Sequence, residues 1–245
     1  MDLKNKIVVI TGSSSGIGKT TAIRFAKEGA KIVVNYRINK AGGEETLKKV
    51  NRYSEGILVQ ADISSPDDID KLFQQVVSKY KTIDILINNA AVPNEKVPFL
   101  KASPYDLSQL LTTNIVGTML CSKKAIEIMT GNSLGKIINT SSIKGWEHGG
   151  GGVTYAVSKA AINSLTRTLA KLVAPNILVN AVAPGYVKTR SYDNMTQDKL
   201  DSFIAQTYLK RWVTEDEIAD AFIFLAKNDA MTGQVIYVDA GFTLK

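Results

Sequence analysis

Short apolar runs alternate with longer amphipathic stretches along most of the chain. Each short run is rich in β-branched residues, which is typical of strands buried on both faces of a sheet. The runs are Ile7 to Thr11, Lys31 to Asn35, Gly56 to Gln60, Ile83 to Asn88, Lys136 to Thr140, Ile177 to Ala183 and Val235 to Val238. Helical periodicity marks the stretches Lys19 to Glu28, Pro66 to Lys79, Tyr105 to Met129, Tyr155 to Val173 and Glu215 to Ala226. Strands that alternate with helices predict an α/β fold with a doubly wound parallel sheet.

One domain over residues 1–245 is the expected organisation. No shift in composition, flexible linker or internal repeat divides the chain. The segment from Tyr186 to Tyr208 breaks the alternation and carries Met195 and Phe203 among charged residues. Two interpretations of it stay open, a lid over a site and a surface insertion held by two buried anchors.

The composition narrows the class of protein. Hydrophobic residues make up 44% and charged residues 22% of the chain, as in folded globular proteins. No apolar run approaches the roughly 20 residues of a membrane helix, and no cleavable leader precedes the first strand. Cys121 is the only cysteine, so no internal disulfide can form and a reducing compartment fits. We therefore expect a cytoplasmic protein with no membrane partner.

The net charge and the histidine content argue against further classes of protein and of active site. The net charge is +7, but the basic residues are scattered among acids and form no basic tail, so we expect no nucleic-acid partner. The excess of positive charge suits an anionic cofactor or substrate. With His148 as the only histidine, neither a Cys/His metal site nor a Ser-His-Asp triad is expected.

The stretch "TGSSSGIGKT" lies between the first strand and the first long helix. Its ending matches a phosphate-binding NTPase loop, but the first glycine which that loop needs falls on Ser13. The spacing of Gly12, Gly16 and Gly18 instead resembles a dinucleotide fingerprint with one extra residue, in the strand-turn-helix context of a Rossmann fold. A purely structural tight turn is the remaining alternative.

The residues at the end of the second strand, "VVNYRIN", indicate which dinucleotide is bound. An acidic residue there would hold the ribose hydroxyls and repel a 2′-phosphate, and the stretch has none. Arg37 can pair with that phosphate, and Lys40 is close enough to assist. The sequence thus favours NADP(H), with NAD(H) as the alternative.

Tyr155 and Lys159 lie one helical turn apart, so their side chains share a helix face. A phenol has a pKa near 10, and a fixed cation beside it should lower that pKa. Such a tyrosine can exchange a proton with an alcohol or a carbonyl while hydride moves. Ser141 and Ser142 end the fifth strand, where a hydroxyl could hold the substrate oxygen.

From Ile7 to Gly241 these motifs resemble the short-chain dehydrogenase/reductase family, in its subgroup of about 250 residues. The motifs that carry the resemblance are Thr11-Gly12-x-x-x-Gly16-Ile17-Gly18, Asp62-Ile63, Asn88-Asn89-Ala90, Asn114, Ser142, Tyr155-x-x-x-Lys159, and Pro184-Gly185 with Thr189. The family's serine precedes its tyrosine by about thirteen positions, which selects Ser142 over Ser141.

The resemblance implies a role for each residue of the catalytic set. Tyr155 would be the acid/base, and Lys159 would lower its pKa and bind the nicotinamide ribose. Ser142 would position the substrate oxygen, and Asn114 would anchor a water linking Lys159 to solvent. No metal is implied.

The resemblance also implies cofactor contacts and an assembly. We expect NADP(H) to contact Gly12, Ser14, Ser15, Gly16, Ile17, Gly18, Asn35, Tyr36, Arg37, Asp62, Ile63, Asn89, Ala90, Tyr155, Lys159, Pro184, Gly185, Val187 and Thr189. A homotetramer is expected, paired through helices whose apolar stripes are Leu107-Leu110-Leu111 and Ile162-Leu165-Leu169. From sequence alone, these stripes could equally belong to the core.

The predicted function is an NADP(H)-dependent oxidoreductase that interconverts a secondary alcohol and a carbonyl by hydride transfer. Its substrate class stays open between 3-oxoacyl-(acyl-carrier-protein) reductases and glucose-dehydrogenase-like sugar or polyol enzymes. "VVNYR" resembles the latter, and Val92-Pro93-Asn94-Glu95 departs from the usual carrier-protein reductase pattern. A catalytically retired dinucleotide sensor is the alternative from another class, and the intact Tyr155 and Lys159 argue against it.

Overall fold

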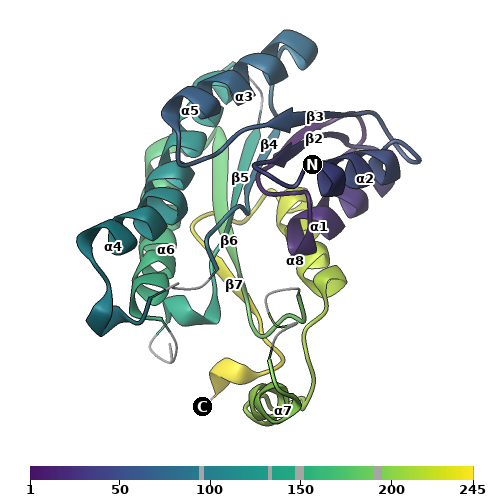
Figure 1. Ribbon diagram of the computed structural model, residues 1–245. Coiled ribbons are helices and arrows are strands. Elements are labelled where there is room, and N and C mark those ends of the chain that lie inside the picture. The colour runs from purple at the N-terminus through teal and green to yellow at the C-terminus, as the bar shows by residue number, and fades with distance from the viewer. Residues whose placement is uncertain (94–96, 132–133, 147–151, 190–191, 193–194, 245) are drawn as a thin grey trace.

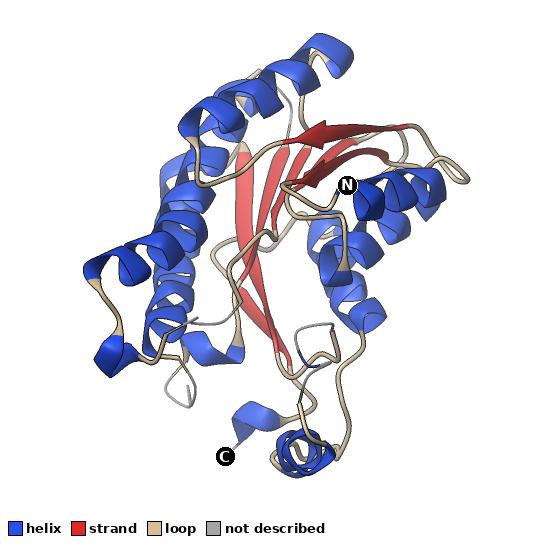
Figure 2. Cartoon of the chain, in the orientation of Figure 1, coloured by secondary structure: helices blue, strands red, loops and turns tan. Residues whose placement is uncertain are grey.

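The seven apolar runs become the strands of one parallel sheet in the computed structural model, which describes residues 1–93, 97–131, 134–146, 152–189, 192 and 195–244. The strands are β1 (Ile7–Ile10), β2 (Lys31–Tyr36), β3 (Gly56–Gln60), β4 (Ile85–Asn88), β5 (Gly135–Thr140), β6 (Ile177–Pro184) and β7 (Val235–Val238). Their order is β3-β2-β1-β4-β5-β6-β7, and every pair is parallel (Figure 2). The order reverses between β1 and β4, where doubly wound sheets bind ligands. The predicted fold class is confirmed.

Helices cover both faces of the sheet (Figure 1). One face carries α1 (Gly16–Lys27), α2 (Lys40–Val50) and α8 (Glu215–Lys227). The other carries α3 (Pro66–Tyr80), α4 (Pro104–Leu111), α5 (Thr118–Met129) and α6 (Val153–Val173). Short helical turns are η1 (Phe99–Lys101), η3 (Ile143–Gly145) and η5 (Phe242–Leu244). None of the helices in the described part of the chain has the length and apolar character needed to cross a membrane.

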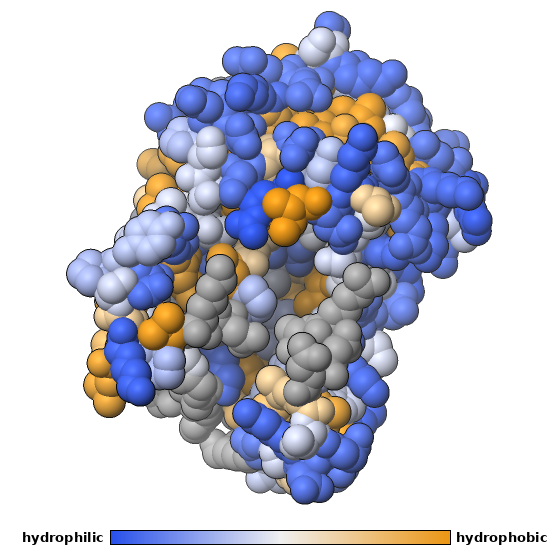
Figure 3. Space-filling model, in the orientation of Figure 1, coloured by the Kyte–Doolittle hydropathy of each residue, from blue (hydrophilic) through white to orange (hydrophobic). Residues whose placement is uncertain are grey.

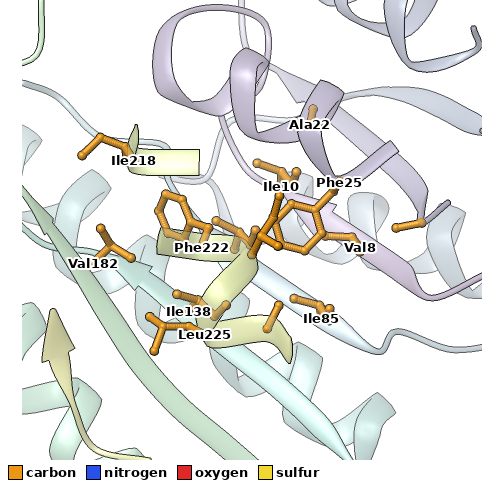
Figure 4. Packing of buried hydrophobic residues seen from close by; sticks show 14 of the residues in the cluster. Val8, Ile10, Ala22, Phe25, Ile85, Ile138, Val182, Ile218, Phe222 and Leu225 are labelled. Carbon is orange, nitrogen blue, oxygen red and sulfur yellow. The ribbon is translucent and has the colours of Figure 1, made fainter. Parts of the chain in front are cut away.

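Alternate residues of each strand feed two separate cores. In β1, Val8 packs with Phe25 of α1 and Phe222 of α8 (Figure 4). Its neighbour Val9 faces the other layer, where it packs in a cluster with Leu72 of α3. Because successive side chains of a strand point to opposite faces, a strand covered on both sides is apolar throughout. This explains why the strands read as continuous apolar runs.

The expected single helix from Tyr105 to Met129 is interrupted. Between α4 and α5 lies a π-helical segment, η2 (Thr112–Gly117). Within it, the Asn114 carbonyl accepts a hydrogen bond from the Thr118 hydroxyl at 2.9 Å. A Cβ added to Gly117 would collide with the carbonyl of Ile63, so glycine allows this close approach. Such π segments are rare and occur frequently at functional sites.

The segment from Tyr186 to Tyr208 contains a further helix, α7 (Gln197–Ala205), which lies near η5 (Figure 1). Phe203 of α7 stacks on Tyr186 with ring centroids 4.6 Å apart, and it also contacts Trp212. Phe203 and Met195 are both only partly buried, and Phe203 anchors this segment through its ring contacts. Residues 190–191 and 193–194 lie outside the described residues, so the lid interpretation stays a prediction.

Candidate active site

A cavity of about 1400 Å³ opens at the carboxyl edge of the strands. It lies beside the glycine turn, the ends of β2 to β5 and the start of α6. Figure 3 shows the molecule hollowed in the middle of this face. The predicted residues that line the cavity are Gly12, Ser14, Ser15, Gly16, Ile17, Gly18, Asn35, Arg37, Asp62, Ile63, Asn89, Ala90, Tyr155, Lys159 and Thr189. The structure thus brings the glycine turn and the tyrosine-lysine pair to one cavity.

The glycine turn needs its glycines for space and for backbone conformation. Gly12 has φ +64°, and a Cβ there would lie 2.8 Å from the Ala90 Cα. A Cβ on Gly18 would lie 2.5 Å from the Gly12 carbonyl oxygen. Helix α1 begins at Gly16, and the Ser15 side chain makes no capping hydrogen bond. The first turn of α1, with Gly16, Ile17, Gly18 and Lys19, therefore lines the cavity, and the free backbone N–H groups of a helix start suit an anion.

Asn35 holds the glycine turn from the end of β2. Its Oδ1 accepts from the Gly12 backbone N–H at 2.9 Å, and its Nδ2 donates to the Ala61 carbonyl at 3.1 Å. Its backbone N–H donates to the Ser13 hydroxyl, and its carbonyl accepts from the Ser13 backbone. The residue is 2% exposed. Although Asn35 lines the cavity as predicted, its polar groups position the turn.

The end of β2 presents a cation and no acid, as the sequence indicates. Arg37 is exposed, and its Nη1 lies 3.7 Å from the Asp62 Oδ2. The other Asp62 oxygen accepts from the Ser64 backbone and hydroxyl at 2.9 and 2.7 Å. Asn39 caps α2 directly after this turn, with its side chain accepting from the Gly42 N–H. Arg37 and the start of α2 therefore border the same end of the cavity.

Lys159 is almost fully buried, with 4% of its surface exposed. Its Nζ donates to the Thr140 carbonyl at the end of β5 over 2.7 Å and lies 5.6 Å from the centroid of the Tyr155 ring. Burial disfavours the charged ammonium and lowers the pKa of Lys159 to about 8. The amine can thus change its charge close to neutral pH.

The structure separates the roles of the two serines at the end of β5. The Ser142 hydroxyl and the Tyr155 phenol share a hydrogen bond. The Ser141 hydroxyl instead bonds to the Asn163 side chain at 2.5 Å. Ser142 is therefore the serine that faces the tyrosine, in line with the thirteen-residue spacing.

The pKa of Tyr155 differs from the sequence-based expectation. Burial raises it, and the hydrogen bond to Ser142 lowers it only in part. The expected lowering by Lys159 does not govern this pKa, because desolvation of the phenol dominates and the ammonium bonds to the Thr140 carbonyl.

Asn114 ties two parts of the site together rather than lining the cavity. Its Oδ1 accepts from the Val92 N–H at 2.7 Å, and its Nδ2 donates to the Val92 carbonyl at 3.1 Å. The same Nδ2 donates to the hydroxyl of Ser158, the neighbour of Lys159, at 3.2 Å. Asn114 thus joins the loop after β4 to helix α6.

Other expected contacts also lie outside the cavity lining. The full set is Tyr36, Asn114, Ser142, Pro184, Gly185 and Val187. Gly185 packs on the backbone of Asp239, since an added Cβ would lie 2.6 Å from the Asp239 Cα. Val187 is buried and pairs with Val213.

Some lining residues were not named as site residues from the sequence, among them Thr20 and Glu215. Thr20 ends the glycine-rich stretch itself, whereas no local pattern could reveal Glu215, because α8 follows the glycine turn by almost 200 residues.

Comparison with known proteins identifies the family. A family model described as enoyl-(acyl carrier protein) reductase matches residues 12–243. A 3-oxoacyl-(acyl-carrier-protein) reductase from Synechocystis sp. is 32% identical over 247 residues, covering 99% of this chain and 98% of the relative. The chain belongs to the short-chain dehydrogenase/reductase family. Another relative in this family, the 3-oxoacyl-(acyl-carrier-protein) reductase of Aquifex aeolicus, is 33% identical, with 98% of both chains covered.

Solved structures of short-chain dehydrogenases/reductases share the whole fold. The Serratia marcescens enzyme superposes with a TM-score of 0.93 at 28% identity, over 99% of this chain and all of the other. A Mycobacterium marinum structure gives the same TM-score and identity over 100% and 98% of the two chains. As a short-chain dehydrogenase/reductase, the protein is an oxidoreductase.

Proposed function

We propose that the protein is an NADP(H)-dependent oxidoreductase that interconverts a secondary alcohol and a carbonyl by hydride transfer. The observation that carries this proposal is the hydrogen-bonded pair of Tyr155 and Ser142, with Lys159 beside it, next to a glycine turn. Two hydroxyls that share a hydrogen bond suit a substrate oxygen, since one can orient it while the other exchanges its proton.

The residues present fit a phosphorylated dinucleotide. Glycine at positions 12 and 18 leaves room that a Cβ would fill, and the start of α1 offers N–H groups to a diphosphate. At the other end of the cavity, Arg37 would pair with a 2′-phosphate, and Asp62 would hold the adenine. Bound there, the nicotinamide would supply or accept the hydride.

The chain's own residues would handle the substrate oxygen and its proton. Ser142 orients the oxygen, and Tyr155 gives it a proton in the reductive direction or removes one in the oxidative direction. Lys159 would bind the nicotinamide ribose and, in its protonated form, favour the phenolate. Asn114 would anchor a water between Lys159 and solvent. In this arrangement the high pKa of Tyr155 suits proton donation to a carbonyl.

A 3-oxoacyl thioester is the substrate class we favour. Besides the cofactor region, the cavity runs along the loop after β4 and along α4, where apolar side chains line it: Val92, Pro93, Val97, Ala102 and Leu110. This apolar part of the wall fits an acyl chain, and the polar residues Tyr105, Asp106, Gln109 and Thr113 line the same region. The Synechocystis and Aquifex relatives, both 3-oxoacyl-(acyl-carrier-protein) reductases, point the same way.

A sugar or polyol is the second substrate candidate, because "VVNYR" resembles enzymes of that kind. Residues Asn94 and Glu95, which argue against a carrier-protein reductase, lie outside the described residues.

We also propose a homotetramer. Leu110 and Ile162 of the apolar stripes are buried within the chain and do not form a surface. Large apolar side chains nevertheless remain exposed nearby in the sequence, at Val116 of η2 and Met119 of α5, which follow α4, and at Val157 of α6. An interface there would cover them. Light scattering on the purified protein should give four times the 26.6 kDa chain mass.

The test of the proposed function combines binding and turnover. Fluorescence titration with NADPH and NADH comes first, followed by absorbance of the reduced nicotinamide with 3-oxoacyl thioesters, sugars, ketones and diols. Tighter binding of NADPH and turnover of a carbonyl are the expected results. Binding without turnover of any compound would favour the sensor alternative, and absence of binding would overturn the proposal.

A further inference from the structure

Glu215, the first residue of α8, reaches across to the start of α1. Its Oε2 accepts a hydrogen bond from the Thr20 hydroxyl at 2.6 Å. Its Oε1 would lie 3.8 Å from a Cβ built on Gly16, the first residue of α1, and Thr189 borders the same point at 4.0 Å. Glu215, Gly16 and Thr189 all line the cavity. A carboxylate therefore sits in front of the turn that would receive the cofactor diphosphate.

Helix α1 has no negative charge of its own at this end. Its first turn carries no acidic residue, whereas the first turn of α3 has Asp67 and Asp68 and that of α4 has Asp106. The N-terminus of a helix carries partial positive charge and is stabilised by a nearby anion. Glu215 supplies that anion from another helix.

We propose that the Glu215 carboxylate competes with the cofactor diphosphate for the N-terminus of α1 and thereby lowers the affinity for any ligand that places a diphosphate there. This proposal rests on the proposed function. A diphosphate bound at the start of α1 and the Glu215 carboxylate would repel each other, since both carry negative charge. At a partly exposed site such repulsion weakens binding on the order of tenfold. Weaker binding speeds cofactor release, a step that often limits turnover.

Glu215→Gln tests the role of the charge with little change in shape, since the glutamine carbonyl can still accept from Thr20. The matched control is Asp216→Asn, on the next residue of α8. Asp216 is bonded to Arg24 at 3.2 Å, is 65% exposed and lies outside the cavity lining. Affinities of both variants and the wild type are measured by calorimetry for NADPH, NADH, ADP-ribose and 2′-AMP.

Glu215→Gln should bind NADPH, NADH and ADP-ribose roughly tenfold more tightly, and 2′-AMP, which lacks the diphosphate, as before. The gain should shrink as salt is raised, because salt screens the repulsion. Asp216→Asn should match the wild type.

Equal affinities of Glu215→Gln and wild type for the three diphosphates would overturn this proposal alone, as would an equal gain in Asp216→Asn. If no probe bound to any of the three proteins, the proposed function itself would fail, and this inference with it.

Discussion

Replacing Lys159 with methionine should change the pH dependence of stability in a way that follows from the burial of this one amine. Lys159 is 4% exposed, and its pKa falls from 10.5 to about 8. Because burial in the folded state disfavours the protonated amine of Lys159, the unfolded chain binds more protons than the folded chain between pH 8 and 10.5. The free energy of unfolding contributed by Lys159 is therefore reduced below pH 8 and recovers as pH rises through this window.

The size of the effect follows from the shift. A fall of the Lys159 pKa from 10.5 to about 8 corresponds to roughly 3 kcal/mol between the two ends of the window, most of which falls between pH 7 and pH 10. Lys159→Met also loses the hydrogen bond to the Thr140 carbonyl. That loss lowers the free energy of unfolding of the variant by the same amount at every pH. The informative quantity is therefore how the difference in free energy of unfolding between variant and wild type changes with pH.

The assay is urea denaturation of wild type and Lys159→Met at fixed protein concentration from pH 7 to pH 10. The stability of the variant relative to wild type should fall by roughly 2–3 kcal/mol over this range. Lys171→Met, at an exposed position of the same helix, controls for the substitution itself. A difference that stays constant with pH would refute the lowered pKa.

Two further substitutions test the cofactor end of the cavity. Arg37→Asp places a carboxylate beside Asp62 where a 2′-phosphate should bind, so NADPH affinity should drop ~tenfold or more while NADH affinity changes little; an unchanged NADPH titration would contradict the assignment. Asn35→Ala leaves the Gly12 N–H and the Ala61 carbonyl without their buried partner, which should cost about 2–4 kcal/mol of unfolding free energy. Urea denaturation within about 0.5 kcal/mol of wild type would show that Asn35 does not hold the turn.

Local sequence patterns predicted the sheet well because strands covered on both faces must be apolar at every position. β3 and β7 begin and end where the runs do, while β4 starts at Ile85, two residues later than expected. The interrupted helix before Met129 could not be predicted, because the π segment depends on contacts with Ile63 and Val92 far along the chain. Periodicity also could not tell which leucines of a stripe face inward, and Leu110 proved to be core.

In the site, too, the motifs formed by adjacent residues could be predicted, and the contacts between distant elements could not. The glycine turn, Arg37 and the tyrosine-lysine pair are each readable from a few adjacent residues. The Thr140 carbonyl that binds Lys159 and the carboxylate of Glu215 belong to other elements, and only the folded chain brings them near. The pKa of Tyr155 was predicted in the wrong direction because spacing on a helix carries no information on desolvation.

The most direct test of Tyr155 as the acid/base compares wild type with Tyr155→Phe at saturating NADPH, using a 3-oxoacyl thioester. Loss of NADPH absorbance reports turnover, and fluorescence reports cofactor binding by the same samples. The variant lacks only the hydroxyl that exchanges the proton, so it should bind NADPH about as well as wild type and show no measurable turnover. Turnover at the wild-type rate by Tyr155→Phe would contradict the mechanism proposed for this protein.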